Sequence, residues 1–270
     1  MLKHKLHESL RPQGQDPRSP IKVLVVGAGG SGGKMTLGLK NLHAALLALG
    51  QAGLSVTLAD GDAVSEANLV RQSFYPSDVG LNKATVLIHR LNVACGLNWQ
   101  AQPQHLTSDD ISQCRADLLI SCVDSRAARA DIKMGLERNK HILYHLDLGN
   151  SRDAGQMVLG CPLGYYARRK RDRLRTAFEL FPELTDTTMP EEDAPSCSTL
   201  EALERQDLFV NDVLVTSSLN LLWRLFRYGE VDYHGAFVSL TAGSVRPLPV
   251  DPALWRRLQR QGQRITAAVK

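Results

Sequence analysis

The 270-residue sequence predicts an α/β fold, with a doubly wound, mostly parallel sheet, helices on both faces and a closing β segment at the C-terminal end. Two observations predict this fold. Short, continuous apolar runs alternate with stretches of helical length, as in a parallel sheet that is buried on both faces. A glycine-rich turn at 27–32 also follows the first apolar run directly, which is typical of the first strand and helix of a Rossmann-like sheet.

The expected elements are read from local patterns in the order of the chain. Continuous apolar runs predict buried strands, and helical spacing of apolar residues predicts helices. Strands are expected at 22–26, 54–60, 117–124 and 141–149. Helices are expected at 33–50, 82–95, 125–139 and 207–228, and one or two closing strands within 235–250.

The chain is expected to consist of an arm and one domain. Residues 1–20 are polar and contain three prolines, so we assign them to an N-terminal arm. The length allows one large α/β domain or two small ones, and we assign 21–270 to a single domain. An acidic, proline-containing stretch at 179–195 predicts a loop that crosses this domain, around 165–197.

Composition argues against several classes of protein. The net charge of +4 is much smaller than in a dedicated nucleic-acid binder. No run of 18 apolar residues predicts a membrane span, and the first 20 residues lack the apolar stretch of a signal peptide, so we expect a cytoplasmic protein. The cysteines are odd in number and form no CxxC pair, which indicates neither a disulfide scaffold nor a four-cysteine zinc site. They are Cys95, Cys114, Cys122, Cys161 and Cys197.

The glycine turn is a candidate phosphate site. Glycines permit a tight turn and close approach of the backbone to phosphate, and the helix that follows offers free N–H groups. The candidate residues are Gly27, Gly29, Gly30 and Gly32. The alternative is a plain, tight strand–helix turn. A P-loop is rejected because Met35 stands where a Mg²⁺-binding hydroxyl is needed, so Lys34 is expected to be an ordinary helix lysine.

Polar residues beyond the second strand favour a triphosphate over a dinucleotide. Asp60, at the end of that strand, is a candidate for holding a ribose. The next segment offers two cations and two amides, which match the charge spread over phosphate oxygens. These residues are Asn68, Arg71, Gln72 and Lys83. Each alone is more often a surface group; their grouping after a glycine turn is what indicates a site.

Asp124 ends another predicted strand, where doubly wound folds bind their ligands. Its carboxylate is a candidate ligand of Mg²⁺. The alternative is that Asp124 caps the helix that follows, and both roles can coexist.

Five motifs in order resemble the ThiF/MoeB/HesA family of adenylating enzymes, which are related to ubiquitin-activating enzymes. The motifs are the GAGGSG turn at 27–32, the D-x-D pair at 60–62, N-L-x-R-Q at 68–72, D-x-G-x-x-K at 78–83 and V-D at 123–124. The resemblance covers about 100 residues and weakens after residue 150. The chain looks most similar to the ThiF-related proteins of PRTRC cassettes, which also carry a ParB-related protein.

The resemblance implies an enzyme that uses ATP and Mg²⁺ to adenylate the C-terminal glycine carboxylate of a small β-grasp, ubiquitin-like protein. It implies that Asp60 holds the ribose and that Asp124 holds Mg²⁺. Asn68, Arg71, Gln72 and Lys83 would surround the phosphates, with Arg71 and Lys83 also stabilising the transition state. Such enzymes are often homodimers in which an arginine of the N-terminal arm enters the partner's site, for which Arg11 and Arg18 are the candidates.

The sequence departs from the family pattern at several points. Ser125 follows the last acid, where the family often has Asn. Only Cys161 lies near the place of the zinc-binding cysteine pairs, so zinc is not expected. Cys197 precedes a capping-box pattern, Ser198-x-x-Glu201, and a helix N-terminus favours the thiolate. Cys197 is therefore a candidate acceptor of the activated carrier, the alternative being an incidental loop cysteine.

Other features are expected to be structural. His141 and His145 are expected on one face of a strand, about 13 Å apart and too far to share a metal. The basic run at 168–171 is assigned to a solvated surface or a dock for an acidic partner in preference to nucleic acid. The alternative to an enzyme is a nucleotide-binding interaction module that has lost transfer chemistry. An NAD-dependent dehydrogenase is the least favoured of the three functions, because no catalytic His/Arg or Tyr/Lys arrangement accompanies the glycine turn.

Overall fold

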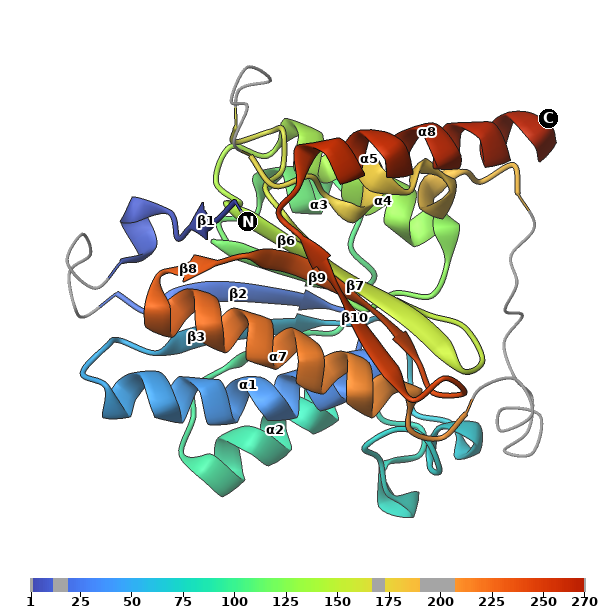
Figure 1. Ribbon diagram of the computed structural model, residues 1–270. Coiled ribbons are helices and arrows are strands. Elements are labelled where there is room, and N and C mark those ends of the chain that lie inside the picture. The colour runs from blue at the N-terminus through green and yellow to red at the C-terminus, as the bar shows by residue number, and fades with distance from the viewer. Residues whose placement is uncertain (1, 12–18, 167–172, 190–206, 270) are drawn as a thin grey trace.

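A computed structural model describes residues 2–11, 19–166, 173–189 and 207–269. Within these residues an eight-stranded sheet has the order β10-β9-β7-β6-β5-β2-β3-β4 (Figure 1). The strands β4, β3, β2, β5 and β6 run parallel, whereas β7, β9 and β10 extend the sheet antiparallel. Their bounds are β2 Ile21–Val26, β3 Leu54–Ala59, β4 Gln100–Gln102, β5 Leu118–Ser121, β6 Tyr144–Asn150, β7 Ala154–Gly160, β9 Tyr233–Ser239 and β10 Ser244–Pro249. The predicted α/β class, mostly parallel sheet and closing β segment are confirmed.

Helices cover both faces of the sheet (Figure 1). On one face α1 packs against α7, and α2 lies nearby; on the other face lie α3, α4, α5 and α8. Their bounds are α1 Gly30–Ala48, α2 Lys83–Cys95, α3 Ser108–Gln113, α4 Arg126–Arg138, α5 Ala177–Leu180, α7 Val210–Tyr228 and α8 Pro252–Val269. Short 3₁₀ turns are η1 Glu8–Leu10, η2 Glu66–Asn68, η3 Pro76–Asp78 and η4 Pro182–Thr185.

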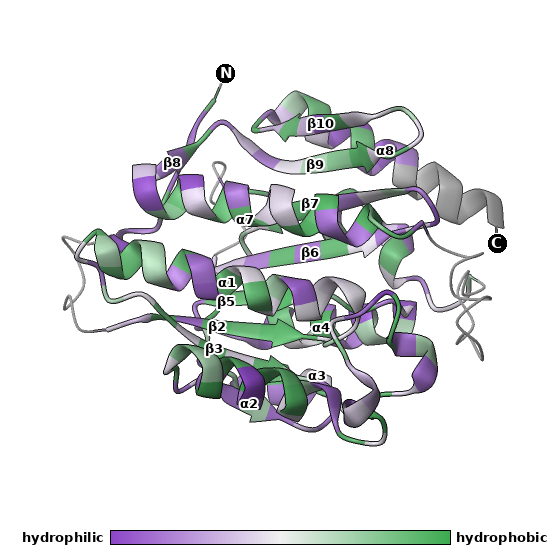
Figure 2. Ribbon diagram, turned by 90° about the horizontal axis from the view of Figure 1, so that it is seen from below, coloured by the Kyte–Doolittle hydropathy of each residue, from purple (hydrophilic) through white to green (hydrophobic). Residues whose placement is uncertain are grey.

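The core lies between these layers. Val25 of β2 and Ile120 of β5 are fully buried because both faces of a central parallel strand are covered. Figure 2 shows β2 largely in green, the hydrophobic end of its scale. Within the described ranges, no helix has both the length and the apolar character that crossing a membrane requires.

Two predicted strands are shorter than expected. β5 ends at Ser121 and not at Asp124, so Asp124 lies in the loop beyond the sheet. β6 begins at Tyr144, so His141 lies in the preceding turn. The expectation that His141 and His145 share a strand is therefore wrong. The apolar pattern runs beyond the end of β5 and begins before the start of β6, which is why it overestimated both strands.

The N-terminal segment packs onto the domain. β1 (His4–Lys5) pairs antiparallel with β8 (Glu230–Val231), and Leu6 and Leu10 are buried. The His7 main-chain N–H also donates to the Tyr144 hydroxyl at 2.9 Å. These described residues of the expected arm are therefore part of the folded body.

Candidate active site

The glycine turn closes so tightly that Gly27 and Gly32 have no room for a side chain. Gly27 has φ +93°, and a Cβ there would lie 2.6 Å from the Cys122 carbonyl oxygen. A Cβ on Gly32 would lie 1.7 Å from the Gly27 carbonyl oxygen. Helix α1 begins at Gly30, earlier than predicted, and its N-cap Gly29 offers no side-chain cap. The first N–H groups of α1 are therefore left for an anion.

Asp60 joins the end of β3 to this turn. It is buried, with 8% of its surface exposed. Its Oδ2 accepts a hydrogen bond from the Ala28 N–H at 2.6 Å, and its Oδ1 accepts one from the Asp62 N–H at 2.8 Å. A carboxylate oxygen has more than one lone pair, so these bonds leave Asp60 able to accept further hydrogen bonds from a ligand.

Lys83 lies on the other side of the D-x-D pair. Its ammonium is 2.9 Å from Oδ2 of Asp62, and the residue is buried although it begins a helix. Asn82 holds this helix start in place, because its Oδ1 caps Thr85 N–H at 3.0 Å and its Nδ2 donates to the Asp60 carbonyl at 2.8 Å. The structure thus places Lys83 on Asp62, two residues after Asp60.

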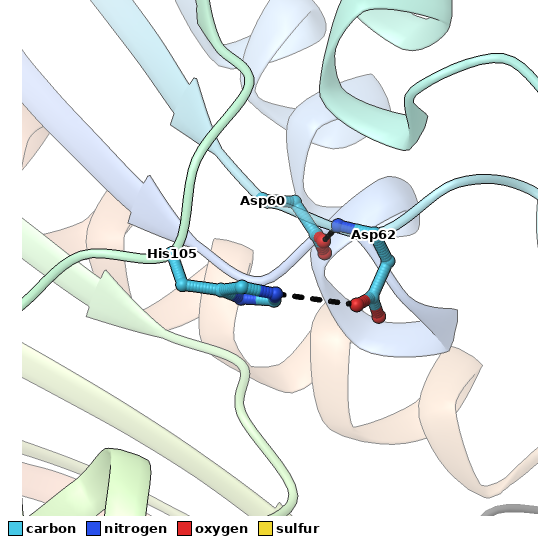
Figure 3. Close-up of side chains that lie close together, drawn as sticks. All are labelled: Asp60, Asp62 and His105. Carbon is cyan, nitrogen blue, oxygen red and sulfur yellow. Dashed lines mark hydrogen bonds and ion pairs between the residues drawn. The ribbon is translucent and has the colours of Figure 1, made fainter.

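Asp60, Asp62 and His105 form a group whose ligand atoms lie within 4.8 Å of one another (Figure 3). His105 Nε2 lies 3.5 Å from Asp62 Oδ1, and the histidine comes from the loop after β4. The Lys83 ammonium already balances Asp62, and imidazole is not a ligand that Mg²⁺ prefers. The chemistry of this group therefore fits an ion-pair cluster beside the glycine turn better than a magnesium site. Sequence reasoning missed His105 because nothing in its local pattern marks it.

The N-L-x-R-Q segment lies against the glycine turn. The Gln72 amide nitrogen is 4.0 Å from the position of a Cβ on Gly29, and the Arg71 carbonyl oxygen is 3.7 Å from that of a Cβ on Gly30. Gln72 Oε1 is buried and accepts no hydrogen bond from the described residues. Asn68 instead closes its own turn, with Oδ1 accepting from the Ser65 N–H at 2.9 Å. The Gln72 side chain thus lies beside the glycine turn.

Asp78 and Gly80, in the D-x-G-x-x-K motif, shape the segment. Burial alone would raise the pKa of Asp78, but hydrogen bonds from the Tyr75 N–H and from Arg90, together with the Arg90 charge, hold that pKa below its usual range. Gly80 adopts φ +87°, which favours glycine. These two residues fix the turn that delivers Lys83.

Asp124 does not cap helix α4. The cap is Ser125, whose Oγ accepts a hydrogen bond from the Ala128 N–H at 3.1 Å, so the capping alternative for Asp124 is wrong. The Asp124 residue is exposed, and its carbonyl accepts from Arg129 Nη1 at 3.0 Å. The carboxylate is thus left for a ligand, while its backbone is fixed from within the domain.

A buried polar cluster supports this loop. Arg129 Nε lies 3.6 Å from Asp147 Oδ1, and Asp147 is fully buried on β6. Ser121 Oγ donates to Asp147 Oδ1 at 2.6 Å and lies 2.8 Å from His145 Nε2. Since the serine proton is used, His145 must donate through Nε2. Burial lowers the pKa of His145 to about 4 even though Asp147 opposes the shift, so this histidine is neutral and structural, as predicted.

Helix α7 contributes two residues to the turn that sequence reasoning missed. Ser31 Oγ donates to Asn211 Oδ1 at 2.8 Å, and Lys34 pairs with Asp212. The contact of Lys34 with Asp212 agrees with the prediction that Lys34 is not a P-loop lysine. No local signal marks Asn211 or Asp212, because their partners lie about 180 residues earlier in the chain.

Other cysteines and arginines considered in the sequence have buried thiols, contacts within their own segment, or positions outside the described residues. Burial raises the pKa of the Cys161 thiol to about 12 and that of the Cys122 thiol well above its usual range. Arg11 Nε donates to the Leu6 carbonyl at 3.1 Å, within its own segment. Cys197, with its capping box, as well as Arg18 and the basic run at 168–171, lie outside the described residues.

Comparison with known proteins places the chain in a family. The chain belongs to the ThiF family, whose model matches residues 3–145, more than half of its length. This confirms the family expected from the motifs. No curated protein matches the sequence significantly.

Solved structures share the fold at low sequence identity. E. coli MccB with AMPCPP and selenomethionine MccA has a TM-score of 0.60 and 18% identity, covering 88% of this chain and 66% of that one. E. coli MccB with ATP has a TM-score of 0.55 and 17% identity, and selenomethionine PaaA has 0.55 and 12%; both cover 87% of this chain and 65% of theirs. The chain thus spans 65–66% of the length of these proteins.

Proposed function

We propose that this ThiF-family protein is an adenylyltransferase that uses ATP to activate a carboxylate. One chain of contacts carries the proposal. Lys83 pairs with Asp62, whose N–H donates to Asp60. Asp60 in turn accepts from the Ala28 N–H in the glycine turn. A buried cation on Asp62 and the glycine turn that begins α1 are therefore joined through the Asp60 carboxylate, an arrangement suited to a ribose joined to phosphates.

The chemistry needs positioning and charge more than a strong nucleophile. A carboxylate oxygen attacks the α-phosphorus of ATP, a new P–O bond forms, and the bond to pyrophosphate breaks with its electron pair leaving on that group. Lys83 and Arg71 would balance the charge that builds up on the phosphate oxygens, while Asn68 and Gln72 hold the phosphates in place. Asp60 would hold the ribose.

Mg²⁺ fits best at Asp124. The carboxylate is exposed at the carboxyl end of the parallel sheet, and no capping bond uses it. Mg²⁺ prefers such oxygen ligands and commonly keeps several waters besides one or two carboxylates. When bound, the ion would offset the charge of the triphosphate.

For the acceptor, we propose the C-terminal glycine of a small β-grasp protein, and for the active form a homodimer in the cytoplasm. The structure of MccB with both AMPCPP and MccA supports an enzyme that brings a nucleotide and a second molecule together. Transfer to Cys197 would follow activation, and the crossing loop around 165–197 within a single 21–270 adenylation domain would carry that residue. We also assign the chain to the PRTRC group on its sequence resemblance.

Exchange of pyrophosphate into ATP tests the proposal. The full chain with Mg²⁺ and a candidate carrier ending in glycine should catalyse exchange, and the same carrier without its last glycine should not. Calorimetry should show Mg·ATP binding well above NAD. ATP binding without exchange for any carrier would favour the nucleotide-binding module, and equal or stronger NAD binding would exclude adenylation.

A further inference from the structure

Helix α7 places an amide over the first residue of α1. Asn211 is the second residue of α7, with 5% of its surface exposed, and its Oδ1 accepts a hydrogen bond from Ser31. A Cβ built on Gly30 would lie 2.6 Å from Asn211 Nδ2 and 3.3 Å from its Cγ. A side chain at Gly30 would therefore require the Asn211 amide to move, and the amide nitrogen lies against the backbone of the glycine turn.

The amide nitrogen has donor capacity to spare. With Oδ1 engaged by Ser31, the two Nδ2 hydrogens are turned toward Gly30, and Nδ2 donates no hydrogen bond within the described part of the chain. The free N–H groups at the start of a helix can bind an anion, and an unused amide donor beside them can bind the same anion.

The neighbouring ion pair fixes this arrangement. Asp212 pairs with Lys34, one turn into α1. Asn211 and Asp212, two consecutive residues of α7, therefore contact the glycine turn and the helix that follows it. The pair also keeps Lys34 on the α7 side. Among residues reaching the turn from other elements, Asn211 then supplies a neutral donor from one side and Gln72 an amide from the other.

We propose that Asn211 is a further nucleotide-binding residue, which donates a hydrogen bond from Nδ2 to a phosphate of the bound nucleotide. The proposal rests on the proposed use of ATP and adds a ligand from the C-terminal half of the chain. It differs from a structural role, in which Asn211 only braces Ser31 through Oδ1.

The substitution Asn211→Asp separates these two roles. It keeps the shape and the Oδ1 acceptor for Ser31 but replaces the donor with an oxygen that carries negative charge. Calorimetry on the full chain should show ATP affinity falling about tenfold to a hundredfold, because a hydrogen bond is lost and the new carboxylate repels the phosphates, with adenosine affinity unchanged. Asn211→Ala, which adds no charge, should still weaken ATP about tenfold and leave adenosine unchanged. The matched control is Asn220→Asp, the same change at an exposed position of the same helix, which should leave both affinities as in wild type.

Other outcomes overturn the proposal. If Asn211→Asp leaves ATP affinity unchanged, or weakens ATP and adenosine equally, Asn211 only braces the turn. If that variant does not fold, Asn211→Ala serves instead, with a loss of about tenfold expected for ATP alone; an equal loss for adenosine would overturn the assignment. A wild-type chain that binds no ATP would overturn the proposed function itself, which is a different result.

Discussion

Arg129 donates a hydrogen bond from Nη1 to the Asp124 carbonyl at 3.0 Å, and the same guanidinium contacts the Leu148 carbonyl at 3.4 Å. One buried cation thus ties the loop after β5 to the neighbouring strand β6. Asp147, fully buried, balances its charge. The backbone at Asp124 is therefore fixed by the buried Arg129 side chain, while the Asp124 carboxylate is exposed.

The first prediction concerns Asp124. Because its carboxylate is exposed and does not cap α4, Asp124→Ala should change the free energy of unfolding by no more than about 0.5 kcal/mol. Pyrophosphate exchange and its Mg²⁺ dependence should be lost. The measurement is exchange across a Mg²⁺ titration, with thermal unfolding alongside. Unchanged Mg²⁺ dependence in a folded variant would remove Asp124 from the site.

The second prediction concerns the buried pair. Arg129→Met should lower the free energy of unfolding by about 3–5 kcal/mol, since it leaves the Asp147 carboxylate buried without a cation. The double variant Arg129→Met with Asp147→Asn should be destabilised less than the sum of the two single variants. Urea unfolding measures both effects. Arg138→Met is the control, because Arg138 pairs with Asp109 at the exposed end of the same helix; a loss as large as that of Arg129→Met would refute the argument.

Features set by local pattern were predictable from the sequence. The glycine turn, the ends of the strands and the D-x-D pair lie within about 40 residues of one another, so Asp60 and the turn could be placed at one sheet edge from strand order alone. Helix α8 also carries a local signal that was missed, since Leu254, Trp255 and Leu258 follow helical spacing.

Contacts between distant segments were not predictable in this way. Asn211 meets Ser31 only because α7 packs beside α1. β1 is only two residues long and forms a strand because it pairs with β8, near residue 230. Two residues are too few for a sequence periodicity to indicate a strand. His105 lies beside Asp62 because β3 and β4 are neighbours in the sheet, and its own surroundings in sequence carry no motif.

The third prediction compares two lysines near the glycine turn. Lys83→Met should lower the rate of pyrophosphate exchange about a hundredfold or more, as expected when a charged group that stabilises the transition state is removed. Folding should survive, because Asp62, the partner left behind, is about half exposed to water. Lys34→Met should have a much smaller effect, since Lys34 pairs with Asp212. The opposite ranking in a steady-state assay would restore the P-loop reading of the turn.

The fourth prediction concerns pH. Burial lowers the pKa of His145 to about 4 in the folded state, from an ordinary value near 6.5. Between these values the unfolded chain binds a proton at this position and the folded chain does not, so folding stability falls as pH decreases from about 6.5 to about 4. The shift corresponds to roughly 3 kcal/mol across that window. His234, which is also buried with its pKa lowered to about 4, adds a similar dependence.

His145→Gln should therefore flatten the loss of stability in this window without abolishing it, measured by urea unfolding at a series of pH values. His141→Gln, at an exposed position four residues earlier, is the control and should leave the pH dependence as in wild type. If His145→Gln left the slope between pH 6.5 and 4 unchanged, His145 would have to take up a proton as readily in the folded protein as in the unfolded chain, and its assignment as a buried neutral histidine would be wrong.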